Sequence, residues 1–302
     1  MENEILRCVD LHKSIGKKEI IKGISFDIKE GEILGFIGPN GAGKTTTIKL
    51  IIGLQNFVKG NITINGYDIK KDFEKAIEKV GTIVENPDLY MYMSGYDNLK
   101  LIANLYKGID KNRIDEVIKL VGLENRIKDK VSKYSLGMRQ RLGIAGAILH
   151  KPNLLILDEP TNGLDPEGIK QIRDLIAKLA EEEKMAVMIS SHNLAEIENV
   201  CNKICIIKNG EIVEQSDIND IKKEVSEDEY ILEVDSIENA KKILEGKVEE
   251  KDKKIIIKST REEIPEIIKK LVESNIKIYS VTENILSLEE AFLKKTGGNV
   301  IE

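Results

Sequence analysis

Short apolar runs alternate with helix-like segments along the chain up to about residue 216. Several of the runs are continuously apolar, which is typical of strands buried on both faces of a sheet. This alternation predicts an α/β domain with a largely parallel sheet covered by helices. The predicted strands are Ile5–Val9, Ser25–Ile28, Ile33–Ile37, Gly60–Ile64, Gly81–Val84, Leu154–Leu157, Ala186–Ser190 and Ile204–Lys208.

The pattern changes between about residues 94 and 151, where apolar positions recur at helical spacing, as in DNLKLIANLY and IDEVIKLVGL. We interpret this stretch as a helical insertion within an α/β domain of residues 1–216. Residues 217–302 alternate as strand, helix, hairpin, helix and strand, which predicts a small C-terminal α+β domain of ferredoxin-like order. In its last segment we expect a helix with Ser287 as N-cap, Glu290 at the capping-box position and Gly297 as C-terminal stop.

Composition narrows the class of protein. Of 302 residues, 41% are hydrophobic and 32% charged, as in a soluble globular protein, and the net charge of −6 argues against nucleic acid as a partner. The sequence has neither a signal-peptide pattern nor an apolar stretch of the roughly 20 residues that a membrane span needs. We therefore expect a cytoplasmic protein. Of its three cysteines, Cys8, Cys201 and Cys205, the last two are expected to be small core thiols rather than zinc ligands.

A glycine-rich stretch, FIGPNGAGKTTTIKL, follows the predicted strand Ile33–Ile37 and matches the phosphate-binding pattern G-x-x-x-x-G-K-[ST]. Its glycines allow backbone N–H groups to turn inward around a phosphate, and the following helix adds its dipole. Lys44 can reach the β- and γ-phosphate oxygens, and the Thr45 hydroxyl can bind Mg²⁺. An ordinary glycine-rich turn is the alternative. The predicted nucleotide-binding residues here are Gly38, Pro39, Asn40, Gly41, Ala42, Gly43, Lys44, Thr45 and Thr46.

A second stretch, LLILDEP, supplies two adjacent acids after the buried strand Leu154–Leu157. Asp158 is suited to Mg²⁺. Glu159 is positioned to polarise an attacking water, a role that typically accelerates a reaction 10²–10⁴-fold. Two acids at a polar sheet edge would be the alternative, but the phosphate loop upstream favours a catalytic site.

The stretch YSLGM, followed by Arg139-Gln140-Arg141, resembles the signature motif of ATP-binding cassette (ABC) proteins, which is usually LSGGQ followed by a basic-Gln-Arg run. Ser135 and Gly137, the phosphate-facing residues of that motif, are retained, whereas its other positions depart from the usual form. Ser135 also has the chemistry of an ordinary helix N-cap. The resemblance covers roughly residues 5–213.

The resemblance implies further roles. Asp165 in TNGLDP resembles the D-loop aspartate, and His192 in ISSH looks like the switch histidine that senses γ-phosphate. By analogy with the family, two such domains would dimerise head to tail. ATP on the Gly38–Thr45 loop of one copy would then be capped by Ser135 and Gly137 of the other.

Two positions depart from the family pattern. Ile15 stands where the family usually has an aromatic ring that stacks on adenine. Glu85, after a predicted strand ending at Val84, takes the place of the Q-loop glutamine, which contacts Mg²⁺ and the attacking water. We expect its carboxylate to bind Mg²⁺ and to add negative charge beside Asp158 and Glu159. A simple turn-facing acid is the alternative.

The resemblance implies an ATP-hydrolysing subunit of an ABC transporter that uses ATP and Mg²⁺ and works with a separate membrane permease. Such a subunit is peripheral on the inner face of the cell membrane. The sequence is similar to the bacitracin and lantibiotic exporter group, which implies an antimicrobial peptide or another drug as cargo. The alternative function is a non-transport cytosolic ABC ATPase. A hydrolysis-dead regulatory cassette is a third, against which Glu159 and His192 both argue.

Overall fold

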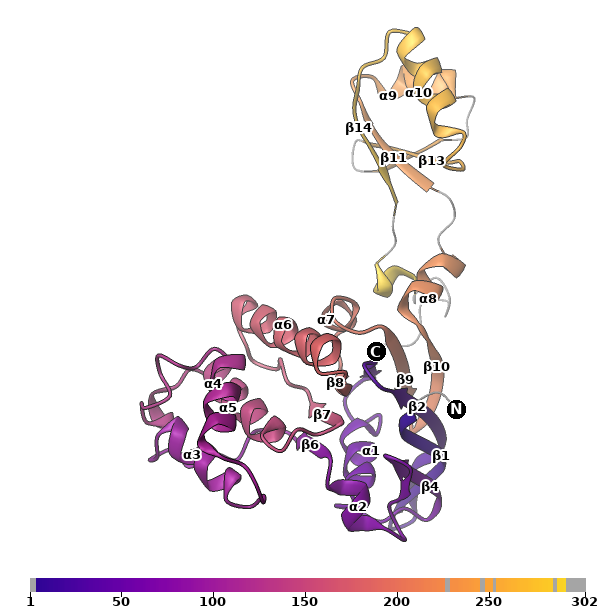
Figure 1. Cartoon of the computed structure of the whole chain (residues 1–302). Helices are drawn as coiled ribbons and strands as arrows, with labels where there is room; N and C mark the ends of the chain where they lie inside the picture. Colours follow the sequence, from indigo (N-terminus) through magenta and orange to yellow (C-terminus); the bar gives the residue numbers. More distant parts are fainter. Residues whose placement is uncertain (1–3, 226–228, 245–247, 252–253, 285–286, 292–302) are drawn as a thin grey trace. The chain divides into compact units, whose positions relative to one another are not determined.

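The computed structural model describes residues 4–225, 229–244, 248–251, 254–284 and 287–291. They form two compact units, of which the first ends at Ile218 and the second begins at Asn219 (Figure 1). No helix in these ranges is both long and apolar enough to cross a membrane.

The first unit contains a six-stranded sheet in the order β10-β9-β3-β8-β7-β6. Its strands are β3 (Ile33–Ile37), β6 (Val80–Ile83), β7 (Leu154–Asp158), β8 (Ala186–Ser191), β9 (Lys203–Lys208) and β10 (Glu211–Asp217). All neighbours are parallel except β10, which is antiparallel to β9. Every residue of β3, β7 and β8 is buried, as their continuous apolar runs predict.

A second, four-stranded antiparallel sheet in the same unit has the order β2-β1-β4-β5. Its strands are β1 (Glu4–Ile15), β2 (Lys18–Lys29), β4 (Lys59–Ile64) and β5 (Tyr67–Asp68). One hydrophobic core joins this sheet to helix α1 (Lys44–Ile51) and to the six-stranded sheet, with Leu6, Ile48 and Phe36 as fully buried members from the three parts. Helix α1 is therefore held by packing on both sides.

Helices α3 (Gly95–Ala103), α4 (Lys111–Leu120) and α5 (Leu136–Ile148) are grouped together, away from β1, β2 and β4 (Figure 1). They fall within the segment 94–151, where helical periodicity was expected, together with a short 3₁₀ helix, η1 (Val131–Lys133). The remaining helices of this unit are α2 (Phe73–Ile77), α6 (Pro166–Glu182) and α7 (Leu194–Glu198).

Strand ends differ from the sequence prediction where the hydrophobic pattern is broken. β1 and β2 are much longer than predicted, because their register shifts interrupt the alternation of apolar and polar residues. β10 was not predicted at all: it is an edge strand without a fully buried residue. The predicted end of a strand at Val84 is wrong, since β6 stops at Ile83 and Glu85 turns the chain with a left-handed φ of 65°.

The prediction that Cys201 and Cys205 are core thiols is confirmed: both are buried and free, and so is Cys8. Burial raises the pKa of all three thiols.

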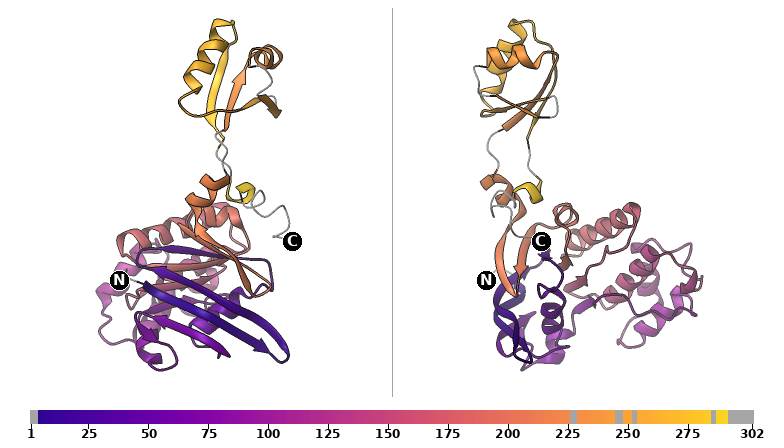
Figure 2. Two further views of the ribbon diagram at one scale, coloured as in Figure 1. Left: turned by 90° about the vertical axis from the view of Figure 1, so that its right-hand side faces the viewer. Right: turned by 180° about the vertical axis from the view of Figure 1, so that it is seen from behind.

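Helix α8 (Ile218–Val225) starts at the last residue of the first unit and continues into the second, which then follows the βαββαβ order expected from the sequence. Its elements are β11 (Glu229–Val234), α9 (Ile237–Ile243), β12 (Val248–Lys251), β13 (Lys254–Lys258), α10 (Ile264–Glu273) and β14 (Ile278–Glu283). The antiparallel sheet has the order β12-β13-β11-β14. The core of this unit includes Leu232, Ile255 and Leu271. Helices α9 and α10 cover one face of the sheet (Figure 2).

The capping box predicted near the C-terminus is confirmed. The Ser287 hydroxyl accepts a hydrogen bond from the Glu290 N–H at 3.2 Å, and the Glu290 carboxylate accepts one from the Ser287 N–H at 3.0 Å. The predicted stop at Gly297 lies outside the described residues.

Candidate functional site

The parallel strands β3, β8, β7 and β6 are neighbours, so their carboxyl ends lie at one edge of the sheet. The glycine-rich loop follows β3, and Asp158 is the last residue of β7. His192 directly follows β8, and Glu85 comes two residues after β6. The topology thus gathers at one edge polar residues that the sequence separates by more than a hundred positions.

The loop of residues 38–43 turns from β3 into α1 because its glycines accept a backbone that other residues resist. Gly41 and Gly43 have left-handed φ angles of 80° and 113°. A Cβ on Gly38 would lie 2.3 Å from the Ile207 carbonyl oxygen, so only glycine fits there. Gly43 is the N-cap of α1 and makes no side-chain hydrogen bond to it, which leaves the first N–H groups of the helix for an anion.

Lys44 lies inside this loop. Its side chain is only 5% exposed, and its Nζ donates a hydrogen bond of 2.7 Å to the Gly38 carbonyl oxygen. The same Nζ lies 3.4 Å from Glu159 Oε1. A buried ammonium is costly unless anionic groups compensate it, so this lysine is suited to receive phosphate oxygens.

Asp158 is 2% exposed and has a hydroxyl partner on each carboxylate oxygen. Thr45 Oγ1 donates to Asp158 Oδ2 at 2.8 Å, and Ser190 Oγ donates to Asp158 Oδ1 at 2.5 Å. Hydroxyl and carboxylate oxygens are the ligands that Mg²⁺ prefers, usually one or two from the protein with water and phosphate completing the shell. Thr45 and Asp158 therefore fit a magnesium ion. A cluster of three or more His, Cys, Asp or Glu ligands is not found in the described part of the chain.

Glu159 lies between a lysine and a histidine. Its Oε1 is 3.4 Å from Lys44 Nζ and its Oε2 is 3.3 Å from His192 Nδ1. Its backbone has a left-handed φ of 48°, which is uncommon for a residue other than glycine. Asn162 Nδ2 donates a long hydrogen bond of 3.4 Å to Glu159 Oε2.

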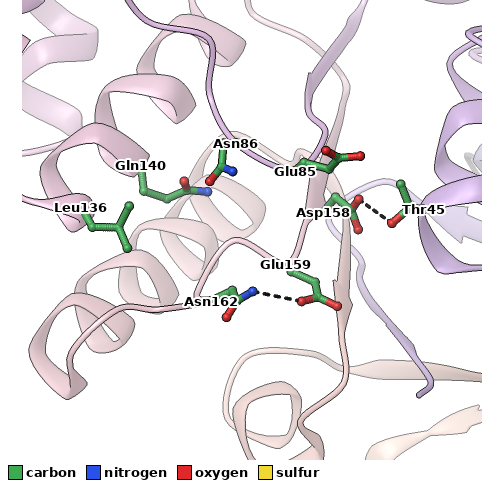
Figure 3. A pocket seen from close by; sticks show the side chains of 8 residues that line it. All are labelled: Thr45, Glu85, Asn86, Leu136, Gln140, Asp158, Glu159 and Asn162. Carbon is green, nitrogen blue, oxygen red and sulfur yellow. Dashed lines mark hydrogen bonds between the residues drawn. The ribbon is translucent and has the colours of Figure 1, made fainter. Parts of the chain in front are cut away.

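A cavity of about 340 Å³ joins the predicted metal ligands to the predicted base (Figure 3). Its lining residues are Thr45, Glu85, Asn86, Leu136, Gln140, Asp158, Glu159 and Asn162. Thr45 and the three acids of this lining thus face the same space as Leu136 and Gln140, from the first half of α5. Gln140 is the buried glutamine of the basic-Gln-Arg run, and it was not among the predicted site residues.

Glu85 is 66% exposed and makes an ion pair with Lys49, whose Nζ lies 3.0 Å from Glu85 Oε1. The Glu85 carboxylate is thus paired with a lysine of α1 and lines the same cavity as Asp158, and its binding of Mg²⁺ stays a prediction. The sequence offered no signal for this pair, since the residues are 36 positions apart and belong to different elements.

The other predicted site residues lie elsewhere. Ser135 is the N-cap of α5, with Oγ accepting from the Met138 N–H at 3.2 Å, as its helix-cap interpretation predicts. Asp165 caps α6 by accepting from the Gly168 N–H at 3.1 Å. Ile15, the last residue of β1, is 56% exposed. Neither these three residues nor Gly137 are among the described residues that line the cavity.

Comparisons with known proteins show which proteins the chain resembles. A family model described as "ABC transporter" matches residues 21–162. The chain is 48% identical over 299 residues to an uncharacterized ABC transporter ATP-binding protein, YdbJ of Bacillus subtilis, covering 98% of this chain and 96% of that protein. It is 38% identical over 317 residues to the bacitracin transport ATP-binding protein BcrA of Bacillus licheniformis, covering 98% and 99%.

A solved structure described as an ATP-binding subunit of an ABC transporter is similar at a TM-score of 0.64 and 32% identity. The match covers 73% of this chain and 92% of that structure. The similarity to YdbJ and BcrA, in contrast, extends over nearly the whole chain.

Proposed function

The chain belongs to the ABC transporter family as an ATP-binding subunit that hydrolyses ATP, and on this premise we propose the residues and partners through which it works. The observation that carries the proposal is the meeting of Lys44, Asp158, Glu159 and His192 at one edge of the sheet.

We assign phosphate binding to residues 38–46. The backbone N–H groups at the start of α1 and the Lys44 ammonium bind the phosphate oxygens of ATP. Mg²⁺ held by Thr45 and Asp158, with Glu85 at the same cavity, neutralises charge on these oxygens when it is bound. Binding of phosphate gives Lys44 Nζ an anionic partner in place of Glu159 Oε1, which releases that carboxylate for catalysis.

We assign the role of general base to Glu159, which orients the attacking water and accepts its proton. His192 keeps the carboxylate in place through its contact with Oε2 and adds a hydrogen-bond donor beside the γ-phosphate. Lys44 stabilises the charge that moves toward the β-phosphate as the γ-phosphoryl group leaves.

A second copy of the ATP-binding unit is the proposed nucleotide-dependent partner. Ser135 caps the start of α5, and Gly137 adds no side chain there, so this helix end presents N–H groups to a phosphate. In a head-to-tail dimer these residues and Asp165 complete the site of the opposite copy, and the exposed Ile15 contacts adenine. This accounts for their position outside the lining of their own chain's cavity.

The permease is proposed to dock beside the helical segment. A groove of about 360 Å³ runs from β6 to α3 and α5 and includes Pro87, Leu89, Ile102 and Tyr106 in its lining. Tyr90, Tyr92 and Leu105 are large exposed side chains in the same part of the chain. A groove with apolar neighbours suits a short helix of a membrane subunit, and such docking would hold the chain at the inner face of the membrane.

For the cargo we propose an antimicrobial peptide or a related lipophilic drug. The support is the full-length similarity to a protein named for bacitracin transport. The non-transport alternative is not favoured, because YdbJ and BcrA, which match over nearly the whole chain, are named as ATP-binding proteins of transporters.

The test is co-expression of the chain with a candidate permease, followed by reconstitution in vesicles. We expect the two to co-purify and a peptide antibiotic to stimulate ATP hydrolysis several-fold. Hydrolysis that no peptide changes, by a chain that no permease retains, would contradict the transport proposal and leave the ATPase intact.

A further inference from the structure

Ser190, on β8, contacts both Asp158 and Glu159. No role was predicted for it from the sequence motifs. Its side chain is fully buried, at 0% exposure. Its Oγ lies 2.5 Å from Asp158 Oδ1 and 2.9 Å from the backbone nitrogen of Glu159. A single hydroxyl thus contacts the proposed metal ligand and the backbone of the proposed base.

The direction of these hydrogen bonds follows from chemistry. The Glu159 N–H can only donate, so Ser190 Oγ accepts from it. The one proton of the hydroxyl then goes to Asp158, which gives a directed chain from the Glu159 N–H through Ser190 to the carboxylate. Because Oδ1 is bound to Ser190, Oδ2 is the oxygen that points to Thr45 and to the phosphate loop.

The same contact constrains Glu159. Its left-handed backbone is unfavourable for a residue with a side chain and persists only where neighbours hold it. The Glu159 N–H is within hydrogen-bonding distance of both the Oγ and, at 3.2 Å, the carbonyl oxygen of Ser190. This backbone conformation brings the carboxylate between Lys44 and His192.

We propose that Ser190 is a positioning residue that orients the metal-binding oxygen of Asp158 and the backbone of Glu159 together. The inference rests on the proposed roles of Asp158 and Glu159. It adds that metal binding and base orientation depend on one buried hydroxyl. Loss of this hydroxyl would therefore weaken both Mg²⁺ binding by Asp158 and the orientation of Glu159.

The test compares Ser190→Ala with the wild-type full chain, using the affinity for a fluorescent ATP analogue with and without Mg²⁺. We expect the Mg²⁺-dependent gain in affinity to fall about 10-fold, the typical effect of losing a hydrogen bond to a charged group. Affinity without Mg²⁺ should be unchanged, and kcat for ATP hydrolysis should fall more than KM rises. Ser190→Thr keeps the hydroxyl and should recover the gain to within about 3-fold.

The chain offers a matched control in Ser259→Ala, which also removes a buried serine hydroxyl that donates to a carboxylate, at 2.8 Å to Glu263. It should leave Mg²⁺ dependence unchanged. An unaltered Mg²⁺ gain in Ser190→Ala, or equal losses in Ser190→Ala and Ser190→Thr, would overturn the inference. Asp158→Asn distinguishes a failure of the Ser190 inference from a failure of the proposed metal site: if it too leaves the gain unaltered, the metal site itself is wrong.

Discussion

Lys49 Nζ lies 3.0 Å from Glu85 Oε1, so an ion pair joins the helix that begins at the phosphate loop to the segment that follows β6. Exposed pairs of this kind contribute about 0–1 kcal/mol to stability. The Lys49–Glu85 pair is important for its position rather than its strength, because Glu85 lines the same cavity as Thr45 and Asp158.

Glu85→Gln should keep ATP hydrolysis but change its Mg²⁺ dependence. The variant loses a carboxylate that faces the proposed metal site, so the half-saturating Mg²⁺ concentration should rise by about 2–5-fold. A Mg²⁺ titration of phosphate release measures this shift. A titration curve identical to that of the wild type would leave Glu85 as a turn-facing acid.

Lys49→Gln is the control for the proposed effect of the Glu85 charge on the nucleotide. It leaves Glu85 unpaired, so ATP binding without Mg²⁺ should weaken through repulsion between the carboxylate and the phosphates. In the Glu85→Gln background the same substitution should cost less, and the difference between the two backgrounds measures the coupling of the pair. Equal costs in both backgrounds would show that the pair is not coupled to the nucleotide.

Lys44→Ala should weaken ATP binding by about 100-fold or more, because a buried ammonium and its charge-assisted hydrogen bonds are lost. Isothermal titration calorimetry measures the affinity directly. Lys75→Ala, which removes an exposed lysine paired with Asp72, is the control and should bind ATP normally. Unchanged affinity in Lys44→Ala would remove the phosphate-loop assignment.

His150 should make the stability of the protein fall at acid pH. Burial lowers the pKa of its imidazole, as do the nearby charges of Lys79 and Arg113, although a hydrogen bond to the Val80 carbonyl opposes them. The unfolded chain therefore binds more protons near pH 6.5, and stability is lost as the pH falls through that value. For one group the slope is at most about 1.4 kcal/mol per pH unit.

The measurement is the free energy of unfolding in urea between pH 7.5 and 5.5 for wild type and His150→Gln. The wild type should lose more stability than the variant over this range. The ring also stacks on Tyr106 with centroids 4.4 Å apart, so the variant should be less stable at pH 7.5. Parallel curves for the two proteins would contradict the linkage.

A chain that ends after Ile218 should still bind ATP, since the proposed site lies wholly in the first unit. The cut keeps β10, whose Asp217 is in register with Lys203 of β9. Circular dichroism and ATP titration of the shortened chain measure folding and binding. Failure to fold would mean that the second unit belongs to the core, against the proposed division into an ATP-binding domain and an accessory domain.

Features of the fold and site that depend on neighbouring residues could be predicted from the sequence, whereas those that depend on distant residues could not. β3 was predicted with its observed ends because all its residues are buried and apolar, whereas β10 carries alternating polar residues at a sheet edge and gave little signal. The roles proposed for Lys44, Asp158 and Glu159 followed from contiguous motifs. Ser190 and Lys49 were missed as site residues because their partners lie 32 and 36 positions away, and only the fold brings them together.

Glu159 is proposed as the base for ATP hydrolysis at the carboxyl edge of the sheet, and the other proposed roles depend on it. The most direct measurement is single-turnover phosphate release by Glu159→Gln, alongside its affinity for ATP. We predict hydrolysis slower by about 10²–10⁴-fold with ATP binding retained, because the amide keeps the shape of the side chain but cannot accept the proton. Wild-type turnover in Glu159→Gln would contradict the claim.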